Sequence, residues 1–297
     1  MTVILPESYH ARKALESRGV ECITKEAAHH QDIRALRIGI LNIMPKAEDY
    51  EFNLLYPLGR SILQIIPVWI RLESHHYKSS NKDHLAKLYI TFKEALSEEK
   101  LDGLIVTGAP VEKFEFEQVR YWDEIVQILT YAKENIPSTL GICWGGLSLA
   151  KYIGIEKEIY PKKLFGVFKI KNLADNNVIA GDLDDEFWCP QSRFAGIADD
   201  ILEKEQAEGR IKLLAYAPET GYTIFETPDH KLVMHLGHPE YNSGRIIQEA
   251  ERDRLKGRND VDPPVNFDVN NPQNLWRSHR NEFFASWIKY IYLTTKY

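Results

Sequence analysis

Short apolar runs alternate with longer amphipathic segments through the first half of the chain. The runs predict buried strands, and the segments between them carry apolar residues at helical spacing. Because strands that alternate with helices pair in parallel, the pattern predicts an α/β fold, with a mostly parallel sheet covered by helices on both faces. The predicted strands are 36–42, 68–72, 104–106 and 138–142, and the predicted helices are 48–66, 85–96, 117–133 and 147–152.

The pattern changes after Tyr152, where shorter predicted strands are separated by polar turns. No linker or internal repeat separates the segments, so we expect a single domain over residues 1–297. It would comprise an N-terminal extension to about residue 35, a core over about 36–256, and a C-terminal loop and helix over about 257–297. The remaining predicted elements are strands at 165–170, 187–193, 213–216, 222–225 and 232–236, helices at 9–18, 246–256 and 276–292, and an ordered loop at 259–273.

The predicted strand 138–142 ends at Cys143, which lies among glycines and precedes a helix. A strand–turn–helix corner of this kind lifts one side chain above the end of the sheet, and glycines are needed where a Cβ would clash. The helix N-terminus favours a thiolate and can stabilise an oxyanion. The plain alternative is a buried structural cysteine, and the flanking glycines favour a nucleophile.

A second candidate motif, Gly237-His238-Pro239-Glu240-Tyr241, follows the predicted strand 232–236. A nucleophilic cysteine needs a base, and the base needs a group that holds its orientation. His238 and Glu240 supply both. Cys143, His238 and the Thr107-Gly108-Ala109 turn all follow predicted strands, and ligands of such sheets bind beyond the carboxyl ends of the strands.

Composition limits the partners and the compartment that we expect. A net charge of −6 and a pI near 6.0 argue against nucleic acid or a membrane as a partner. The three cysteines, Cys22, Cys143 and Cys189, are too scattered for a disulfide framework or a zinc site, which fits a reduced cytoplasmic compartment. No run has the length of a transmembrane helix, and residues 1–7 lack the pattern of a signal peptide. Neighbouring histidines point in different directions, so we expect no metal at His29–Asp32.

The motif Gly141-Ile142-Cys143-Trp144-Gly145, with His238-Pro239-Glu240 about a hundred residues later, resembles the class I glutamine amidotransferase architecture, which is flavodoxin-like. Further stretches narrow the resemblance, over about residues 1–293, to the homoserine O-acyltransferase family of methionine biosynthesis. These stretches are 30–34, 41–45, 102–110, 121–122, 237–241 and 276–279.

The resemblance implies a ping-pong acyl transfer, with acetyl-CoA as a co-substrate and no bound cofactor. The thiolate of Cys143 would attack the thioester, and His238, oriented by Glu240, would then deprotonate the acceptor hydroxyl. The N–H groups of Trp144 and of the Gly108-Ala109 turn would hold the oxyanion. Related enzymes also suggest a homodimer.

Four more positions match the family's motifs. Lys163 and Ser192 match residues that contact the substrate, and Arg252 matches an arginine that would pair with the acceptor's carboxylate. Without the family, surface charges and a loop hydroxyl would be the simpler interpretation. Glu112 matches a position linked to the donor, where a glutamate accompanies acetyl-CoA and a glycine accompanies succinyl-CoA. A buried carboxylate would repel a succinyl group, which predicts acetyl transfer.

This chain departs from the family's usual pattern at four places, which are Gln191, 46–52, 146–148 and Arg280 within 279–281. We expect these segments to shape the acceptor pocket. Homoserine and serine differ by one methylene, which a pocket distinguishes by only about 1–3 kcal/mol. Serine O-acetylation, which feeds cysteine synthesis, therefore stays open.

Two further alternatives use the same fold. One is a glutamine amidotransferase or a peptidase, although a glutaminase usually works beside a synthetase domain and none is visible in the sequence. The other is a non-catalytic binding protein, which the intact Cys143, His238 and Glu240 disfavour. We interpret Cys22 and Cys189 as structural residues.

Overall fold

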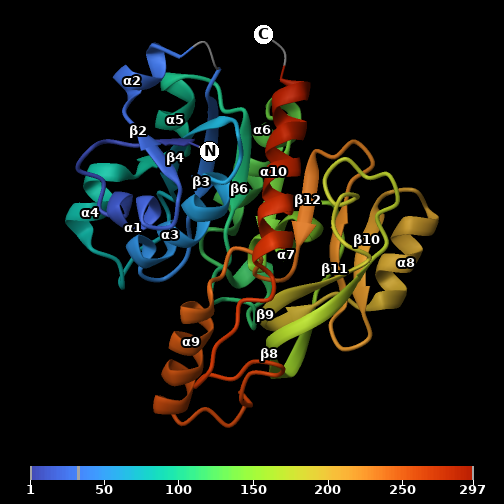
Figure 1. The fold of residues 1–297 in the computed structure, drawn as a ribbon. Coiled ribbons are helices and arrows are strands. Elements are labelled where there is room, and N and C mark those ends of the chain that lie inside the picture. Colours follow the sequence, from blue (N-terminus) through green and yellow to red (C-terminus); the bar gives the residue numbers. More distant parts are fainter. Residues whose placement is uncertain (1, 32–33, 296–297) are drawn as a thin grey trace.

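One twelve-stranded sheet runs through the molecule and joins segments from both halves of the chain (Figure 1). The computed structural model describes residues 2–31 and 34–295. The strand order is β2-β1-β4-β3-β6-β7-β12-β11-β10-β8-β9, with β5 paired to β4. The strands are β1 (Thr2–Ile4), β2 (Glu21–Ile23), β3 (Leu36–Leu41), β4 (Gln64–Arg71), β5 (Ile90–Thr91), β6 (Gly103–Val106), β7 (Thr139–Ile142), β8 (Glu158–Asn172), β9 (Glu186–Gly196), β10 (Lys212–Ala217), β11 (Gly221–Glu226) and β12 (Leu232–His235).

The pairing divides the sheet into a parallel and an antiparallel part. Neighbouring strands from β2 to β12 run parallel, whereas β12, β11, β10, β8 and β9 are antiparallel to one another in turn. The change in sequence character after Tyr152 therefore marks the beginning of the antiparallel part. The prediction of a mostly parallel α/β sheet is confirmed, and its central strands are buried apolar runs, as expected for strands covered on both faces.

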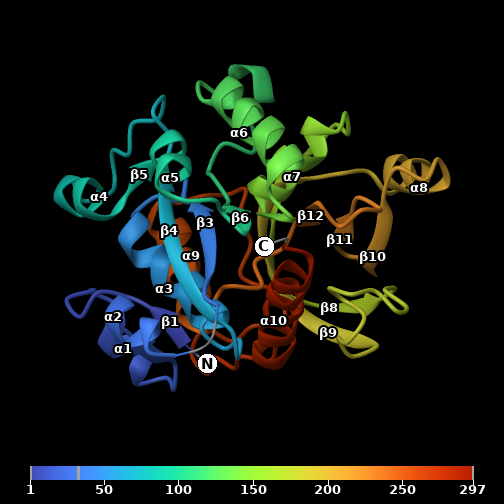
Figure 2. The same cartoon turned by 90° about the horizontal axis from the view of Figure 1, so that it is seen from above.

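Helices cover both faces of the sheet and enclose two separate cores (Figure 2). Leu54 and Phe284 belong to the core under α3 and α10, while Ile125 and Leu147 belong to the core under α6 and α7. The C-terminal helix α10 packs beside α3. The helices are α1 (Arg12–Glu16), α2 (Lys25–His29), α3 (Ala47–Leu58), α4 (Lys82–Leu88), α5 (Phe92–Glu98), α6 (Trp122–Asn135), α7 (Trp144–Tyr152), α8 (Asp199–Ala207), α9 (Ser243–Leu255) and α10 (Arg277–Thr294), with a 3₁₀ turn at Phe116–Gln118.

The predicted helix 48–66 is too long. Helix α3 ends at Leu58, and Gly59 follows it with its N–H donating to the carbonyl of Leu55 at 2.8 Å. A Cβ on Gly59 would lie 2.6 Å from Val3 Cγ2, so this close approach requires glycine. Ile62 and Ile65 continued the helical spacing by coincidence, because Ile62 is 82% exposed and Ile65 lies in β4.

The predicted helix 85–96 is two helices separated by the short strand β5. Helix α4 ends before Tyr89, whose backbone is extended, and Thr91 then caps α5. The hydroxyl of Thr91 accepts from the N–H of Glu94, and the carboxylate of Glu94 accepts from the N–H of Thr91. This capping box is visible in the sequence as Thr-x-x-Glu and marks the break that the apolar spacing hid.

Four further elements were not predicted. Strands β1 and β2 extend the sheet beyond β4, so the N-terminal extension adds strands to the sheet edge. They are three residues long, which is too short for a periodic signal. Helices α2 and α8 are mostly polar and were overlooked for that reason. Residues 32–33, which belong to the stretches 29–32 and 30–34 discussed above, lie outside the described residues.

None of the helices in the described part of the chain is long and apolar enough to cross a membrane.

Candidate active site

Cys143 occupies the strained corner between β7 and α7. Its φ of 53° and ψ of −115° are rare for a residue with a side chain. A Cβ on Gly145 would lie 2.0 Å from the carbonyl oxygen of Val106, and one on Gly141 would lie 2.4 Å from that of Gly145. Glycines are therefore required around this turn, as predicted, because the start of α7 packs closely against the ends of β6 and β7.

His238 and Glu240 follow β12, the strand that pairs with β7. The N–H of Cys143 donates to the carbonyl of His235 at 2.8 Å, so the two strand ends are joined directly beside the sulfur. Nδ1 of His238 lies 2.7 Å from Oε1 of Glu240. The N–H of His238 donates to the carbonyl of Pro190 at 2.8 Å, which fixes the turn from the β9 side. The structure thus brings together all three predicted catalytic residues.

Two tyrosines that the sequence analysis missed support this pair. The hydroxyl of Tyr50, in α3, donates to Oε1 of Glu240, and the ring of Tyr241 stacks on the imidazole of His238 with centroids 4.1 Å apart. Both tyrosines are buried, and so is Glu240. The imidazole is therefore held in place along its face and through its carboxylate partner. Tyr241 is the last residue of the His-Pro-Glu-Tyr stretch. Tyr50 lies within the stretch 46–52, but no motif there indicates its contact with Glu240.

Burial and charge act against each other at the catalytic pair. Burial alone would lower the pKa of His238, but the neighbouring charges of Cys143 and Glu240 raise that pKa well above its ordinary value. Burial raises the pKa of the Cys143 thiol, and His238 opposes this rise. A protonated imidazole beside the sulfur is the arrangement that a cysteine nucleophile requires.

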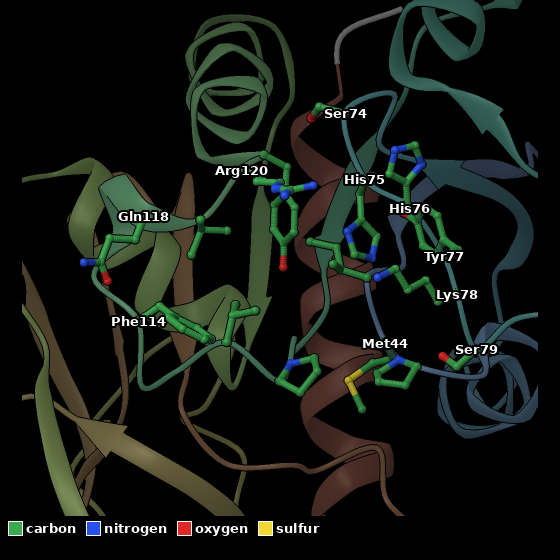
Figure 3. Close-up of a pocket in the computed structure, with 16 residues that line it drawn as sticks. Met44, Ser74, His75, His76, Tyr77, Lys78, Ser79, Phe114, Gln118 and Arg120 are labelled. Carbon is green, nitrogen blue, oxygen red and sulfur yellow. The ribbon is translucent and has the colours of Figure 1, made fainter.

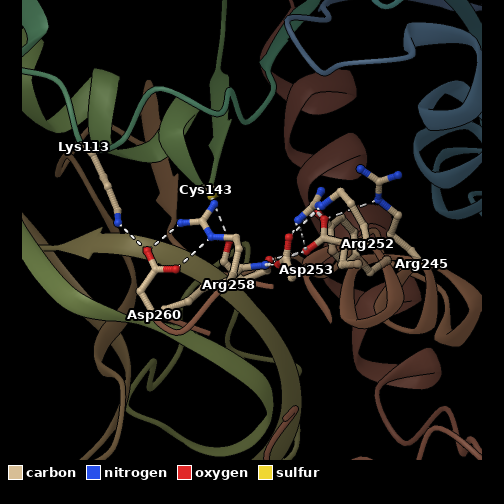
Figure 4. Close-up of polar contacts among 11 residues, drawn as sticks. Lys113, Cys143, Arg245, Arg252, Asp253, Arg258 and Asp260 are labelled. Atoms are coloured by element: carbon tan, nitrogen blue, oxygen red, sulfur yellow. Dashed lines mark hydrogen bonds and ion pairs between the residues drawn. The ribbon is translucent and has the colours of Figure 1, made fainter. Parts of the chain in front are cut away.

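Glu112 lies beside the sulfur, on the loop that follows β6. Its Oε1 is 3.5 Å from Sγ of Cys143, and burial raises the pKa of its carboxyl. Two contacts hold the loop in place. Lys157 donates to the carbonyl of Glu112 at 2.7 Å, and Lys113 donates to Asp260 at 2.7 Å (Figure 4).

The predicted substrate-binding residues meet at two carboxylates of α9. Nζ of Lys163 lies 3.1 Å from Oε2 of Glu249 and 3.0 Å from Oδ2 of Asp253. The hydroxyl of Ser192 donates to Glu249, and the guanidinium of Arg252 donates twice to Asp253, at 2.8 and 3.0 Å (Figure 4). Lys163 and Ser192 are buried rather than on the surface, whereas the side chain of Arg252 is 45% exposed.

Ser192 connects this polar group to the nucleophile, because its carbonyl oxygen lies 4.0 Å from Sγ of Cys143. Burial would raise the pKa of Glu249, but the charges of Lys163, Arg245 and Arg252 lower it well below its ordinary value. Glu249 is therefore an ionised carboxylate beside buried cations. Glu249 and Asp253 were missed, although their spacing of four residues places both on one face of a helix.

The proposed oxyanion donors lie next to the sulfur in the chain or in space. Trp144 is the first residue of α7, where backbone N–H groups have no partner within the helix. Gly108 borders the nucleophile from the other side, since a Cβ on it would be 3.5 Å from Cβ of Cys143. Ala109 follows Gly108 and is buried.

Two of the residues given above as departures from the family's pattern, Gln191 and Arg280, support the catalytic turn. Gln191 is buried, and its Oε1 accepts from Nε of Arg193 at 2.9 Å. A Cβ on Gly237 would be 2.8 Å from Nε2 of Gln191, so this amide packs directly behind the residue before His238. Arg280 is also buried and donates to the carbonyl of Tyr241 at 3.1 Å.

The other two segments given above as departures, 46–52 and 146–148, also form hydrogen bonds inside the protein. Tyr50 comes from the stretch 46–52, and within 146–148 the hydroxyl of Ser148 donates to the carbonyl of Gly145 at 2.7 Å, inside α7. The site is thus held in place by contacts within the protein that come from Gln191, Tyr50, Ser148 and Arg280.

Cys189 packs beside the catalytic turn, since a Cβ on Gly237 would lie 2.7 Å from its Sγ. Cys22 and Cys189 are buried, and burial raises the pKa of each thiol. His10, Glu51 and His84 offer three ligand atoms within 4.8 Å of one another and could hold a metal ion. Both oxygens of Glu51 already accept hydrogen bonds, Oε1 from Tyr89 at 2.8 Å and Oε2 from Tyr9.

Solved structures share this fold at low sequence identity. A glutamine amidotransferase from Thermotoga maritima has a TM-score of 0.52 at 17% identity, with 88% of this chain and 99% of that chain covered. The glutaminase domain of Trypanosoma brucei CTPS, solved with bound acivicin, has a TM-score of 0.53 at 12% identity, with 88% and 96% covered. The predicted class I glutamine amidotransferase-like architecture is confirmed.

Curated relatives match over their whole length. The homoserine O-acetyltransferase of Bacillus cereus is 40% identical over 305 residues, with 100% of this chain and 99% of that protein covered. The homoserine O-acetyltransferase of Bacillus cytotoxicus is 39% identical over 303 residues with the same coverage. The family model described as homoserine O-succinyltransferase matches residues 2–297. The chain therefore belongs to the homoserine O-succinyltransferase family.

Proposed function

We propose that this protein is a homoserine O-acetyltransferase of methionine biosynthesis, which moves an acetyl group from acetyl-CoA to the side-chain hydroxyl of homoserine through a thioester on Cys143. One observation carries the proposal. The Cys143–His238–Glu240 group lies beside a buried set of paired cations and carboxylates, and Ser192 contacts both. The names of the curated relatives, at about 40% identity over the full length, support the same substrate.

The first half-reaction transfers the acetyl group to sulfur. The thiolate of Cys143 attacks the thioester carbonyl, the bond from that carbon to the CoA sulfur breaks, and CoA leaves as a thiol with the proton from His238. The N–H groups of Trp144 and of the Gly108-Ala109 turn stabilise the oxyanion. One thioester replaces another, so this step is nearly balanced in energy.

The second half-reaction transfers the acetyl group to oxygen. His238, now neutral, takes the proton of the acceptor hydroxyl as the oxygen attacks the enzyme thioester. The Cys143 sulfur then leaves as a thiolate, and the protonated imidazole beside it restores the starting pair. Glu240 holds Nδ1 of His238 throughout, so that Nε2 stays free for proton transfer.

The charged group around α9 binds the acceptor. Lys163 and Arg252 suit an α-carboxylate, and Glu249 and Asp253 suit an α-ammonium group. Homoserine and serine share both charges and differ only in length. The distance between the charged group and Cys143 therefore decides which hydroxyl reaches the thioester.

The acetyl group fits the position of Glu112. A partly buried carboxyl group 3.5 Å from the sulfur narrows the space beside the thioester and disfavours a donor that carries its own carboxylate. A succinyl group has such a carboxylate, whereas an acetyl group has only a methyl. We therefore expect Glu112→Gly to gain activity with succinyl-CoA, and a variant without that gain would contradict the role of Glu112.

The deciding experiment measures thiol release from acetyl-CoA with homoserine and serine in parallel, and with succinyl-CoA as the donor control. Turnover with homoserine and acetyl-CoA supports the proposal, and turnover favouring serine moves the protein to cysteine synthesis. Glutamine hydrolysis without acyl-CoA would instead indicate a glutaminase. An acetyl adduct on Cys143, trapped by mass spectrometry without acceptor and absent in Cys143→Ala, tests the intermediate.

A further inference from the structure

A cavity of about 430 Å³ opens at the same edge of the sheet as Cys143. Figure 3 shows the side chains that line it. Its walls are the segment after β3, the loop after β4 and the loop after β6, which are represented by Met44, Lys78 and Val111. In the sheet these strands are neighbours in the order β4-β3-β6, and β7 with Cys143 comes next. The cavity therefore lies beside the nucleophile, where ligands of parallel sheets bind.

The cavity and the nucleophile share a wall. Val111, which lines the cavity, directly precedes Glu112, whose carboxyl group contacts the sulfur. Met44, another lining residue, has its sulfur 3.3 Å from the Cβ position of Gly108, and Cβ of Cys143 is 3.5 Å from that same position. Met44 and the segment 111–112 thus border both the cavity and the surroundings of Cys143.

The lining combines apolar walls with positive charge at the surface. Met44, Val111 and the half-exposed ring of Phe114 supply apolar area. Among the described residues that line the cavity, none is Asp or Glu, although the whole chain has a net charge of −6. Lys78 and Arg120 are exposed, and neither forms an ion pair within the part of the chain that the structure describes.

We propose that this cavity binds the CoA part of the thioester donor, an inference that rests on the proposed function. The apolar walls take the pantetheine arm, which leads the thioester toward Cys143. Lys78 and Arg120 bind the phosphate groups at the nucleotide end, where Arg is suited to two oxygens at once and Lys acts as a point charge. The acceptor enters from the side of α9 and Ser192, so donor and acceptor approach the sulfur from different sides.

The acceptor site is unsuited to the phosphates of CoA, so the donor needs a second binding site. The buried group of Lys163, Glu249 and Asp253 is matched to a small molecule with both charges, and its cations are already paired with carboxylates. The phosphates of CoA carry several negative charges and need unpaired cations. Among the described residues that line the cavity, Lys78 and Arg120 meet that requirement.

The test compares two donors that differ only at the nucleotide end, acetyl-CoA and S-acetylpantetheine. In the double variant Lys78→Ala/Arg120→Ala, we expect the ratio of KM for acetyl-CoA to KM for S-acetylpantetheine to rise about 10-fold or more, because only acetyl-CoA has phosphates to lose as partners. Lys204→Ala, an exposed lysine on α8, is the control for removal of a surface charge. An unchanged ratio in the double variant overturns the proposal.

A binding measurement separates this proposal from the proposed function. Titration calorimetry of CoA with Cys143→Ala, with and without the Lys78→Ala/Arg120→Ala substitutions, needs no turnover. Weaker CoA binding in the triple variant supports the site even if neither donor is turned over, which would then count against the proposed function alone. Equal CoA affinity in the two proteins, or no CoA binding to Cys143→Ala, overturns the site.

Discussion

Tyr50 shows how a residue outside the recognisable motifs can act on the catalytic group. Its hydroxyl donates to the same oxygen of Glu240 that holds His238. The other oxygen of Glu240 is buried without a partner among the described residues, so the carboxylate depends on Tyr50 and His238. Tyr50 is a positioning residue, because it acts on the imidazole only through Glu240.

We expect Tyr50→Phe to lower kcat/KM about 10-fold or more, since a hydrogen bond to a charged group contributes about 1.5–3 kcal/mol. Loss of this donor also changes the charge environment of His238, so the pH–rate profile should shift. The measurement is thiol release across pH. Tyr56→Phe, in the same helix, is the control, because no described residue receives a hydrogen bond from the Tyr56 hydroxyl. Equal profiles for the two variants would refute the role of Tyr50.

His235, at the end of β12, is the basis of a second prediction at the residue scale. It is buried, and burial lowers its pKa to about 3, while its Nδ1 accepts the N–H of Gly237 at 3.2 Å. An unfolded histidine has a pKa of about 6.5, so between these values the unfolded chain binds a proton that the folded protein does not. The folded state therefore loses stability as the pH falls below about 6.5.

In His235→Gln, the side-chain oxygen can still accept from Gly237, but the titration is gone. We expect the loss of unfolding free energy between pH 7 and pH 5 to be about 2 kcal/mol smaller in this variant than in the wild type. Urea unfolding at the two pH values measures it. His29→Gln, an exposed histidine at the end of α2, should behave as the wild type. The prediction fails when both variants show the same pH dependence.

At the scale of elements, helix α10 holds the catalytic turn from behind. Trp276 and Arg280 both donate to the carbonyl of Tyr241, at 2.7 and 3.1 Å, and the guanidinium of Arg280 lies 4.8 Å from the centre of the Tyr56 ring. The C-terminal helix thus connects α3 to the turn that carries His238. The contacts of Arg280 give it a structural role in this chain.

We expect Arg280→Met to lower the free energy of unfolding by about 1–3 kcal/mol, because the buried carbonyl of Tyr241 loses one of its two donors. Activity should also fall, since the turn then moves more freely. Chemical denaturation gives the first value and thiol release the second. Lys289→Met, an exposed position on α10, is the matched control. A variant as stable and active as this control would show that α10 does not support the turn.

The elements also show what a sequence can and cannot predict. The central strands and the Cys143 corner were predicted well, because buried parallel strands are apolar runs and the corner requires glycines. The predicted helices are wrong where a local signal overrides the apolar spacing, as at Gly59 and at the Thr91–Glu94 capping box. Short edge strands leave too few residues for a periodic pattern.

In the site, the residues that could be predicted from the sequence are those that lie within a recognisable motif. Tyr50 and Asp253 have no motif of their own, and they join the site only because α3 and α9 pack where they do. Contacts between distant segments, such as Tyr50 with Glu240 across 190 positions, have no local trace in a single sequence.

For the whole molecule, the continuous sheet implies that its parts depend on one another. The sheet runs from the N-terminal extension to β9, and β7 and β12 lie in its middle. We propose that residues 1–297 form a single domain, and we expect one unfolding transition, with near-UV and far-UV circular dichroism coinciding along a denaturant gradient. Two separated transitions would show instead that the antiparallel part is a domain of its own.

The ion pairs of Lys163 have a consequence for the kind of molecule that can enter beside α9. Lys163 is already paired with Glu249 and Asp253, so an entering molecule has to displace these ion pairs. Only a zwitterion offers both a negative group to Lys163 and a positive group to the two carboxylates. Water and simple alcohols carry no charge with which to make that exchange, and an anion or a cation alone leaves one buried partner unpaired. We therefore expect this group to bind zwitterionic amino acids in preference to neutral or singly charged molecules.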